Sequence, residues 1–273
     1  MKKLKISRST LILILVFVAG LSLLIYPSFS NWWNSTRATK AIASYSETVA
    51  QMDRAEYDQM WEEAQAYNQA LLQKGYRYHM SDQERAEYES ILDVSGTGIM
   101  GYIEIPSLRV SLPVYHGVDE AVLQIAVGHI EGSSLPVGGP STHCVVSGHR
   151  GLPSAKLFTD LDELVEGDIF LFRVLDEVIT YEVDTILIVE PEDVSALEIL
   201  EGEDRCTLVT CTPYGINSHR LLVQGHRIEN LPDQFIHVTA EAVPIDPILV
   251  APLVAVPVLL FLFAAVMIKY RKK

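Results

Sequence analysis

A cysteine and an arginine near the end of the chain have the types and the spacing for covalent chemistry. Cys211 ends a run rich in β-branched residues, and Arg220 begins a second apolar run after a loop that contains Pro213 and Gly215. Two strands joined by this loop would bring the thiol of Cys211 beside the guanidinium of Arg220. Cysteine attacks as the thiolate, which a neighbouring positive charge stabilises. The pair therefore indicates nucleophilic catalysis, with Arg220 binding a developing oxyanion.

Such a nucleophile also needs a base, and the base is sought among the eight histidines because arginine does not lose its proton. His149 is the best placed, since it follows an apolar run and has glycines on both sides that allow a sharp turn at a strand end. Alternation along a strand turns His219 away from the face of Arg220, and His226 lies near the far end of that strand. The surroundings of three others predict loops: His116, His129 and His143.

The cysteine spacing predicts how two of the strands pair. Cys144 lies five residues before His149, and Cys206 lies five residues before Cys211. If the two strands are parallel neighbours, His149 meets Cys211 and Cys144 meets Cys206, with the second pair on the opposite face. Cys144 and Cys206 then form either a disulfide or, as we favour, two buried thiols. Zinc binding by these residues is the weakest alternative, because no Cys-x-x-Cys or paired-His spacing occurs.

Strand patterns begin at Gly96, where short runs rich in β-branched and aromatic residues recur between Gly and Pro. This spacing favours a mainly β domain, either a barrel or a sandwich. We expect strands at residues 99–105, 110–115, 143–147, 168–173, 178–189, 207–211 and 221–228, with short helices at 119–127, 156–164 and 194–200. Before this region, residues 46–74 predict one amphipathic helix that stops at Gly75, and residues 83–92 predict a shorter one.

Two uncharged apolar runs, residues 11–26 and 247–268, bracket the domain, and basic residues lie just outside each run. Their length predicts two membrane helices with both chain ends in the cytoplasm. We favour an uncleaved first anchor over a cleaved signal peptide, because no small-residue cleavage site follows it closely. Eight of the 21 Lys and Arg lie in these ends, so the part between them has 13 against 35 acidic residues, a formal charge of −22. Nucleic-acid binding is therefore not expected.

These residues resemble the sortases, the membrane-anchored cysteine transpeptidases of Gram-positive bacteria. Residues 207–211 read T-L-V-T-C, which is similar to the family's signature around its cysteine, and residues 147–151 read S-G-H-R-G, which is similar to its histidine segment. Arg220 stands where the family has its catalytic arginine. The similarity extends over residues 96–228 and is closest to class C, the pilus-assembling group, in which a second, C-terminal membrane helix is typical.

The resemblance implies a closed β-barrel of about eight strands and a defined reaction. Cys211 attacks the Thr–Gly carbonyl of a Leu-Pro-x-Thr-Gly-like sorting signal and forms a thioester. His149 protonates the leaving amine and deprotonates the incoming one, and Arg220 holds the oxyanion or the substrate backbone. We also assign substrate or oxyanion contacts to Thr210 and Thr212. The implied partners are the membrane, the sorting signals of pilins or surface proteins, and a lysine-bearing pilin as acceptor. The resemblance implies no metal and no organic cofactor.

One stretch departs from the class C pattern. Many class C enzymes cover the cysteine with a flap bearing Asp-Pro and an aromatic residue, but residues 76–94 contain no proline. The usual lid anchor is therefore not expected here. A similar plug by Tyr76, Tyr78 or Tyr88 is an alternative that the sequence leaves open.

The sequence thus predicts a chain of seven parts. They are a cytoplasmic basic end (1–10), a transmembrane anchor (11–28), an extracellular helical segment with a candidate lid (29–95), the catalytic barrel (96–230), a tether (231–246), a second transmembrane helix (247–268) and a second cytoplasmic basic end (269–273).

Three other functions remain to be weighed. A housekeeping-type sortase would attach surface proteins to a cell-wall precursor, and the C-terminal anchor counts against it. A secreted cysteine peptidase would use water as the acceptor. A non-catalytic surface protein carrying its own sorting signal would need a Thr-Gly pair that residues 231–235 lack.

Overall fold

The computed structural model describes residues 8–75, 77–230 and 247–271. It divides into two units, residues 1–33 with 239–273 and residues 34–238, and each is considered by itself. The predicted tether at residues 231–246, the extreme ends of the chain and Tyr76 lie outside the described residues.

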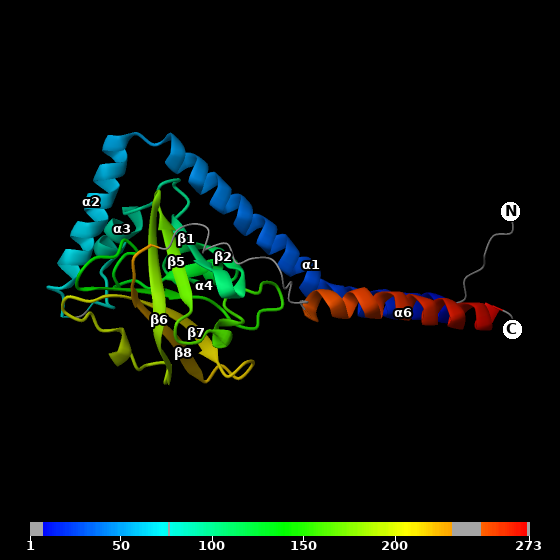
Figure 1. Cartoon of the computed structure of the whole chain (residues 1–273). Helices are drawn as coiled ribbons and strands as arrows, with labels where there is room; N and C mark the ends of the chain where they lie inside the picture. The colour runs from blue at the N-terminus through cyan, green and yellow to red at the C-terminus, as the bar shows by residue number, and fades with distance from the viewer. Residues whose placement is uncertain (1–7, 76, 231–246, 272–273) are drawn as a thin grey trace. The chain divides into compact units, whose positions relative to one another are not determined.

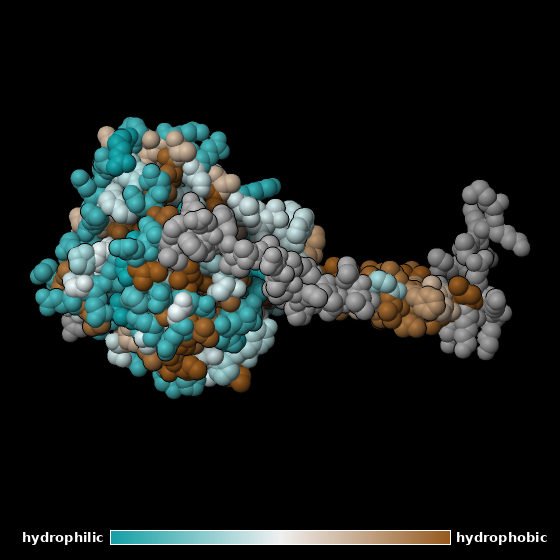
Figure 2. Space-filling model, in the orientation of Figure 1, coloured by the Kyte–Doolittle hydropathy of each residue, from teal (hydrophilic) through white to brown (hydrophobic). Residues whose placement is uncertain are grey.

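The first unit is helical. It contains the beginning of α1 (Arg8–Gln51) and all of α6 (Pro247–Arg271), with Pro27, Pro252 and Pro257 inside helices. Among the described residues, α1 alone is long and apolar enough to cross a membrane, and the apolar stretch of α6, Ala255–Val266, is shorter. In Figure 2 hydrophobic side chains predominate on the visible face of these helices. The first predicted span therefore fits the structure, whereas the second is not confirmed.

The second unit is built around a closed barrel of eight strands (Figure 1). The strands are β1 (Ile99–Ile105), β2 (Val110–His116), β3 (Val127–His129), β4 (Thr142–Ser147), β5 (Ile169–Val174), β6 (Glu177–Val189), β7 (Asp204–Thr212) and β8 (His219–Arg227). Around the barrel they follow the order β1-β2-β3-β4-β7-β8-β6-β5. Closure leaves no exposed sheet edge. The prediction of a mainly β barrel is confirmed.

Two pairings position the functional end of the barrel. Strands β4 and β7 are parallel neighbours, with Cys144 opposite Cys206. Strands β7 and β8 form an antiparallel hairpin in which Cys211 lies opposite Arg220. Both registers agree with those inferred from the spacing of the cysteines and from the turn residues between the two apolar runs.

Strand alternation places the core inside the barrel. Alternate residues along the strands point inward, and the fully buried ones include Ile103, Val114, Val146, Phe172, Leu208 and Val223. Their neighbours along the chain point outward, where some pack under loops and helices. A residue's parity on its strand therefore decides whether it belongs to the core or to the outer surface.

Three short helical turns connect the strands where inserts are expected, but each is shorter than predicted. They are α4 (Glu120–Leu123), η2 (Leu161–Glu163) and η3 (Ser195–Leu197), and a further turn, η1 (Pro106–Leu108), joins β1 to β2. The predicted helix at residues 119–127 is wrong at its end, because Val127 begins strand β3. A strand of three residues is too short to show an alternating pattern.

The single helix predicted at residues 46–74 is also wrong. Helix α1 ends at Gln51, and a second helix, α2 (Arg54–Leu71), begins after the N-cap residue Asp53. The Asp53 carboxylate accepts a hydrogen bond from Glu56 N at 2.9 Å. An aspartate at this position competes with helix continuation by satisfying a free backbone N–H. Helix α3 (Asp82–Ser90) lies within one residue of its predicted start and begins with a capping box.

Helices α2 and α3 are fastened to the barrel by buried polar contacts, and both lie against it in Figure 1. The Asn68 side chain donates to Leu135 O at 3.1 Å and accepts from Leu135 N at 2.7 Å. The Tyr88 hydroxyl lies 2.8 Å from His129 Nδ1. The loop positions predicted for His116 and His129 are wrong, because both lie on strands. His143, whose surroundings also suggested a loop, lies on β4, in agreement with the strand predicted at residues 143–147.

Candidate active site

Cys211 and Arg220 are brought together by the β7–β8 hairpin. They are directly opposed in the antiparallel register, so their side chains leave the same face of the sheet. Both are half-buried. The Arg220 guanidinium is held by its own loop, because Nη1 donates to His219 O at 3.1 Å and to Asn217 O at 3.3 Å. The hairpin thus fixes a cation beside the thiol.

His149 follows strand β4 and lies at the same end of the barrel as Cys211. The parallel register ends with Ser147 opposite Val209, two residues before His149 and Cys211 respectively. Gly148 N then donates to Val209 O at 3.0 Å, and the Thr210 hydroxyl donates to Gly148 O at 2.8 Å. These two bonds tie together the strand ends that carry the imidazole and the thiol.

Gly148 is required where the chain turns toward His149. A Cβ atom added at this position would lie 2.7 Å from Cδ2 of the Phe158 ring, which is buried. The aromatic ring can therefore pack directly under the backbone that precedes His149. The His149 side chain remains 27% exposed, which leaves the imidazole accessible from solvent.

The two threonines beside Cys211 have buried side chains. Thr210 points away from the Cys211 face, and its hydroxyl is engaged by Gly148 O. Thr212 pairs with His219 across the hairpin. A substrate or oxyanion contact by either residue stays a prediction, and the burial of both side chains favours a contact through the backbone.

The other two cysteines belong to the core. Cys144 and Cys206 are free thiols, 2% and 0% exposed, on the inward face of β4 and β7. Burial raises the pKa of Cys206 well above its usual value. The preference for two buried thiols over a disulfide is confirmed, and Cys211 is the one accessible thiol of the three.

An apolar cluster lies on the outer face of the sheet that also carries Cys211. It consists of Val145, Val209, Leu222 and Leu197, with Tyr78, Ile130, Leu187, Val189 and Ala196 packed against it. We call it the outer cluster. Val209 precedes Cys211 by two residues and therefore shares its face, about 7 Å away along the strand. The outer cluster thus runs up to the candidate nucleophile.

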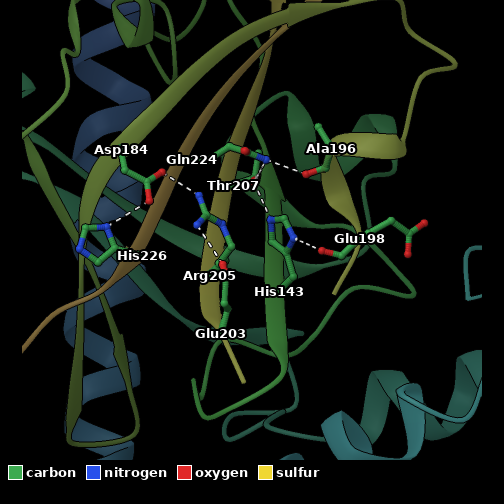
Figure 3. A network of polar contacts seen from close by, with 9 residues as sticks. All are labelled: His143, Asp184, Ala196, Glu198, Glu203, Arg205, Thr207, Gln224 and His226. Carbon is green, nitrogen blue, oxygen red and sulfur yellow. Dashed lines mark hydrogen bonds and ion pairs between the residues drawn. The ribbon is translucent and has the colours of Figure 1, made fainter. Parts of the chain in front are cut away.

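A buried hydrogen-bond network fixes the segment after η3 over the outer cluster (Figure 3). His143 Nδ1 faces Glu198 O at 2.8 Å, and His143 Nε2 lies 2.7 Å from the Thr207 hydroxyl. Gln224 Nε2 donates to Ala196 O at 2.7 Å and to the Thr207 oxygen at 3.1 Å. A carbonyl can only accept, so Nδ1 must carry the proton and Nε2 must accept from Thr207. The network is complete when His143 is neutral.

This requirement predicts a pH-dependent stability. Burial lowers the pKa of His143, and the positive charges of Arg205 and Arg77 lower it further. The hydrogen bond to the Glu198 carbonyl acts in the opposite direction and raises it. Because the pKa of His143 is lower in the folded protein than in the unfolded chain, neutral His143 stabilises the fold fully at pH values above its unfolded pKa of about 6.5. This stabilisation is lost as the pH falls through the folded-state pKa. We expect the free energy of unfolding to fall less between pH 7.5 and pH 5 in His143→Gln than in the wild type.

Urea unfolding at the two pH values measures the difference. The exposed His79, changed to Gln, is the control and should keep the pH dependence of the wild type. An unchanged pH dependence in His143→Gln would show that the network tolerates a charged imidazole.

The segment before α3, residues 77 and 78, also binds the loop that carries Leu197 and Glu198. Arg77 Nη2 forms an ion pair with Glu198 Oε2 at 3.0 Å and lies 3.5 Å from Leu197 O, and the Tyr78 hydroxyl donates to Leu197 O at 3.4 Å. The backbone fits closely here, because a Cβ on Gly132 would lie 2.1 Å from Arg77 O. Residues 77–78 therefore lie over the outer cluster, with Tyr78 packed into it.

The three tyrosines considered as a plug thus differ in position. Tyr78 packs on the outer cluster, whereas Tyr88 is fully buried in the core beside His129 and cannot cover Cys211. Tyr76 lies outside the described residues.

Other candidate sites do not compete with this one. A cavity of about 450 Å³ is lined by the end of α1, the start of α2 and residues of β1 and β5 such as Tyr102 and Arg173, on the wall of the barrel away from Cys211. No group of three or more His, Cys, Asp or Glu side chains suited to a metal ion occurs among the described residues.

The sequence analysis missed several residues around the site. The anchoring roles of His143 and Arg77 depend on partners more than 50 positions away in the chain. Glu120 is a further case, since its Oε2 lies 3.8 Å from His149 Nε2. No local pattern signals such contacts, although the strand predicted at residues 143–147 already placed His143 on a strand.

Comparisons with known proteins agree with this geometry. Residues 103–228 match the family model described as the sortase domain. Sortase C1 from Streptococcus agalactiae is 51% identical with a TM-score of 0.69, over 70% of this chain and 100% of that one. Sortase C from Streptococcus pneumoniae, whose structure is described as informative on pilin substrate specificity, is 48% identical with a TM-score of 0.64, over 71% of this chain and 99% of that one.

A more distant relative matches over a smaller region. Sortase D of Bacillus subtilis is 30% identical over 131 residues, which are 47% of this chain and 63% of that protein. The chain therefore spans less than two thirds of the length of this relative.

Proposed function

The chain belongs to the sortase family, and we propose that it is a membrane-anchored cysteine transpeptidase that joins pilin subunits. The observation that carries the proposal is the meeting of three groups at one end of the barrel. Cys211 and Arg220 are directly opposed on β7 and β8, and His149 follows the parallel partner strand β4. A thiol, a fixed cation and an imidazole are the groups that acyl transfer through a thioester needs.

In the proposed reaction the Cys211 thiolate attacks the carbonyl of threonine in a Leu-Pro-x-Thr-Gly-like signal. Arg220 binds the oxyanion, and His149 gives its proton to the leaving glycine amine as the C–N bond breaks. The thioester then receives an incoming amine, whose proton His149 accepts. The acyl group leaves Cys211 as the new amide forms, and no cofactor takes part.

The pilin lysine is the proposed acceptor because the two solved structures described above are sortases of class C. A housekeeping role would use an amine of a cell-wall precursor instead. The apolar window of α1 and the basic residues before it favour a membrane anchor with the barrel outside the cell.

The full chain in detergent micelles, incubated with a Leu-Pro-x-Thr-Gly peptide, tests the proposal. Intact-mass spectrometry should detect an acyl adduct, and a pilin-derived lysine peptide should convert it to an isopeptide product. Transfer only to a cell-wall precursor would favour the housekeeping role. Absence of an adduct with a panel of sorting peptides, in both the wild type and the variant considered next, would exclude a transpeptidase.

We propose further that residues 77–80 act as a lid without the Asp-Pro anchor. Tyr78 packs on the outer cluster, and both Arg77 and Tyr78 bind the loop that carries Leu197. Tyr78→Ala removes the partly buried ring and its hydrogen bond. The closed position of the segment should lose about 1.4 kcal/mol or more of stabilisation, so the acylation rate should rise about tenfold. Stopped-flow or quenched mass spectrometry of the adduct measures the rate.

The neighbouring His79 is the matched control, because it is exposed and lies outside the outer cluster. His79→Ala should acylate at the rate of the wild type. Equal rates for Tyr78→Ala and the wild type would mean that this segment does not limit access to Cys211.

A further inference from the structure

One carboxylate beside the candidate base has no place in the reaction described so far. Glu120 Oε2 lies 3.8 Å from His149 Nε2, and the Glu120 side chain is 73% exposed. Gln124, one turn later, donates to the other carboxylate oxygen at 2.5 Å. The carboxylate is thus oriented with one oxygen toward the imidazole and an open side toward solvent.

The two basic side chains that follow His149 most closely in the chain are each paired with an aspartate. Arg150 forms an ion pair with Asp162, and Lys156 forms one with Asp160. Within the described residues, Glu120 is in no ion pair with Lys or Arg, and its charged partner is His149 alone. Whether its negative charge is compensated therefore depends on the protonation of His149.

The reaction changes that protonation state. Before acylation, an imidazolium at His149 compensates Glu120. After the leaving amine has taken the proton, His149 is neutral, and Glu120 becomes an uncompensated carboxylate next to the thioester. A free lysine side chain, with an ordinary pKa of about 10.4, arrives as an ammonium ion at neutral pH. The acyl-enzyme thus presents a carboxylate at the stage at which a cation must bind.

From this geometry we propose that Glu120 is the binding residue for the ammonium group of the acceptor lysine. The inference rests on the proposed function and deepens it by assigning the acceptor side of the site. Held between Glu120 and His149, the ammonium gives one proton to His149 Nε2. The amine nitrogen attacks the thioester carbonyl, the C–S bond breaks as the amide bond forms, and the second proton passes to solvent.

Two acceptors that differ in charge, a lysine peptide and hydroxylamine, distinguish binding of the ammonium group by Glu120 from an effect of Glu120 on His149. Lysine peptide is a cation at pH 7.5, whereas hydroxylamine is mostly neutral and attacks the same thioester. Each is titrated against the preformed acyl-enzyme of the full chain in micelles, in the wild-type and Tyr78→Ala backgrounds. Glu120→Gln should raise the half-saturating concentration of the lysine peptide about fivefold, as for loss of an exposed ion pair, and leave hydroxylamine unaffected.

Glu190 provides the matched control, because its carboxylate lies 3.2 Å from Nε2 of His219, a histidine with no assigned role in the reaction. Glu190→Gln should leave both acceptors unchanged. An equal loss with both acceptors in Glu120→Gln would mean that Glu120 acts through His149, and no loss with lysine would remove it from the site. Either result overturns the inference while the acyl adduct still supports the transpeptidase. Failure of every background to form an adduct would reject both.

Discussion

Replacement of Cys211 by alanine should abolish the acyl adduct and reduce transfer on the order of 10⁴-fold or more. The thiol is the atom to which the acyl group would be bonded, so neither Arg220 nor His149 can compensate for its loss. The fold should be retained, because Cys211 is half-buried at a strand end and its strand is held by neighbours on both sides. Intact-mass spectrometry with the sorting peptide measures the adduct.

A thiol reagent gives an independent control on the same variant. The wild type should be alkylated once under native conditions, and Cys211→Ala should not be alkylated, because Cys144 and Cys206 are buried. Cys206→Ala, which removes a core thiol from the same strand, should still form the adduct. An adduct on Cys211→Ala would mean that another residue is the nucleophile.

The equal spacing of two residue pairs predicted the register at the centre of this site, on the condition that the two strands are parallel neighbours. Five residues separate Cys144 from His149 and Cys206 from Cys211, and β4 and β7 are parallel neighbours with the register that this equal offset predicts. Strand alternation then separates the core thiols from the accessible one. Strand alternation and the β7–β8 hairpin could be predicted because periodicity and turn residues act locally, within one or two strands. That β4 and β7 are neighbours is a contact between distant segments, which local patterns do not signal.

The outer cluster and its lid segment could not be predicted in this way. Tyr78 and Leu197 are more than 100 positions apart, and their contact depends on where α2 and α3 lie on the barrel. That position is set by contacts such as the two hydrogen bonds of Asn68 to Leu135, which join segments 67 positions apart. A polar residue in a helix gives no sequence signal of such a partner.

Hydrophobic periodicity also gave a wrong prediction where one side chain ended a helix and began the next. Asp53 divides a long amphipathic pattern into two helices, because its carboxylate caps the second one. The hydrophobic pattern continues across the break, so periodicity alone joins the two. The prediction of a loop around His129 was wrong because its surroundings depend on distant contacts. His129 lies on a strand of only three residues, and its side chain is contacted by Tyr88 of helix α3.

Replacement of His149 by alanine should slow both steps of the reaction, the acylation of Cys211 and the transfer to lysine. His149→Ala removes the group that keeps Cys211 reactive, protonates the leaving amine and accepts the proton of the incoming amine. General acid–base catalysis contributes about 10²- to 10⁴-fold, so both adduct formation and lysine transfer should fall by at least about 100-fold. Single-turnover acylation and aminolysis of the adduct measure the two steps separately.

The buried His143 is the matched control for this prediction, because it lies on β4, the strand that leads to His149, but serves the network around Thr207. His143→Gln should lose stability at neutral pH and retain an adduct, whereas His149→Ala should keep its stability and lose the adduct. The half-exposed position of His149, after the last paired residue of β4, is the reason for expecting little structural cost. Equal acylation by His149→Ala and the wild type would assign the proton transfers to another group.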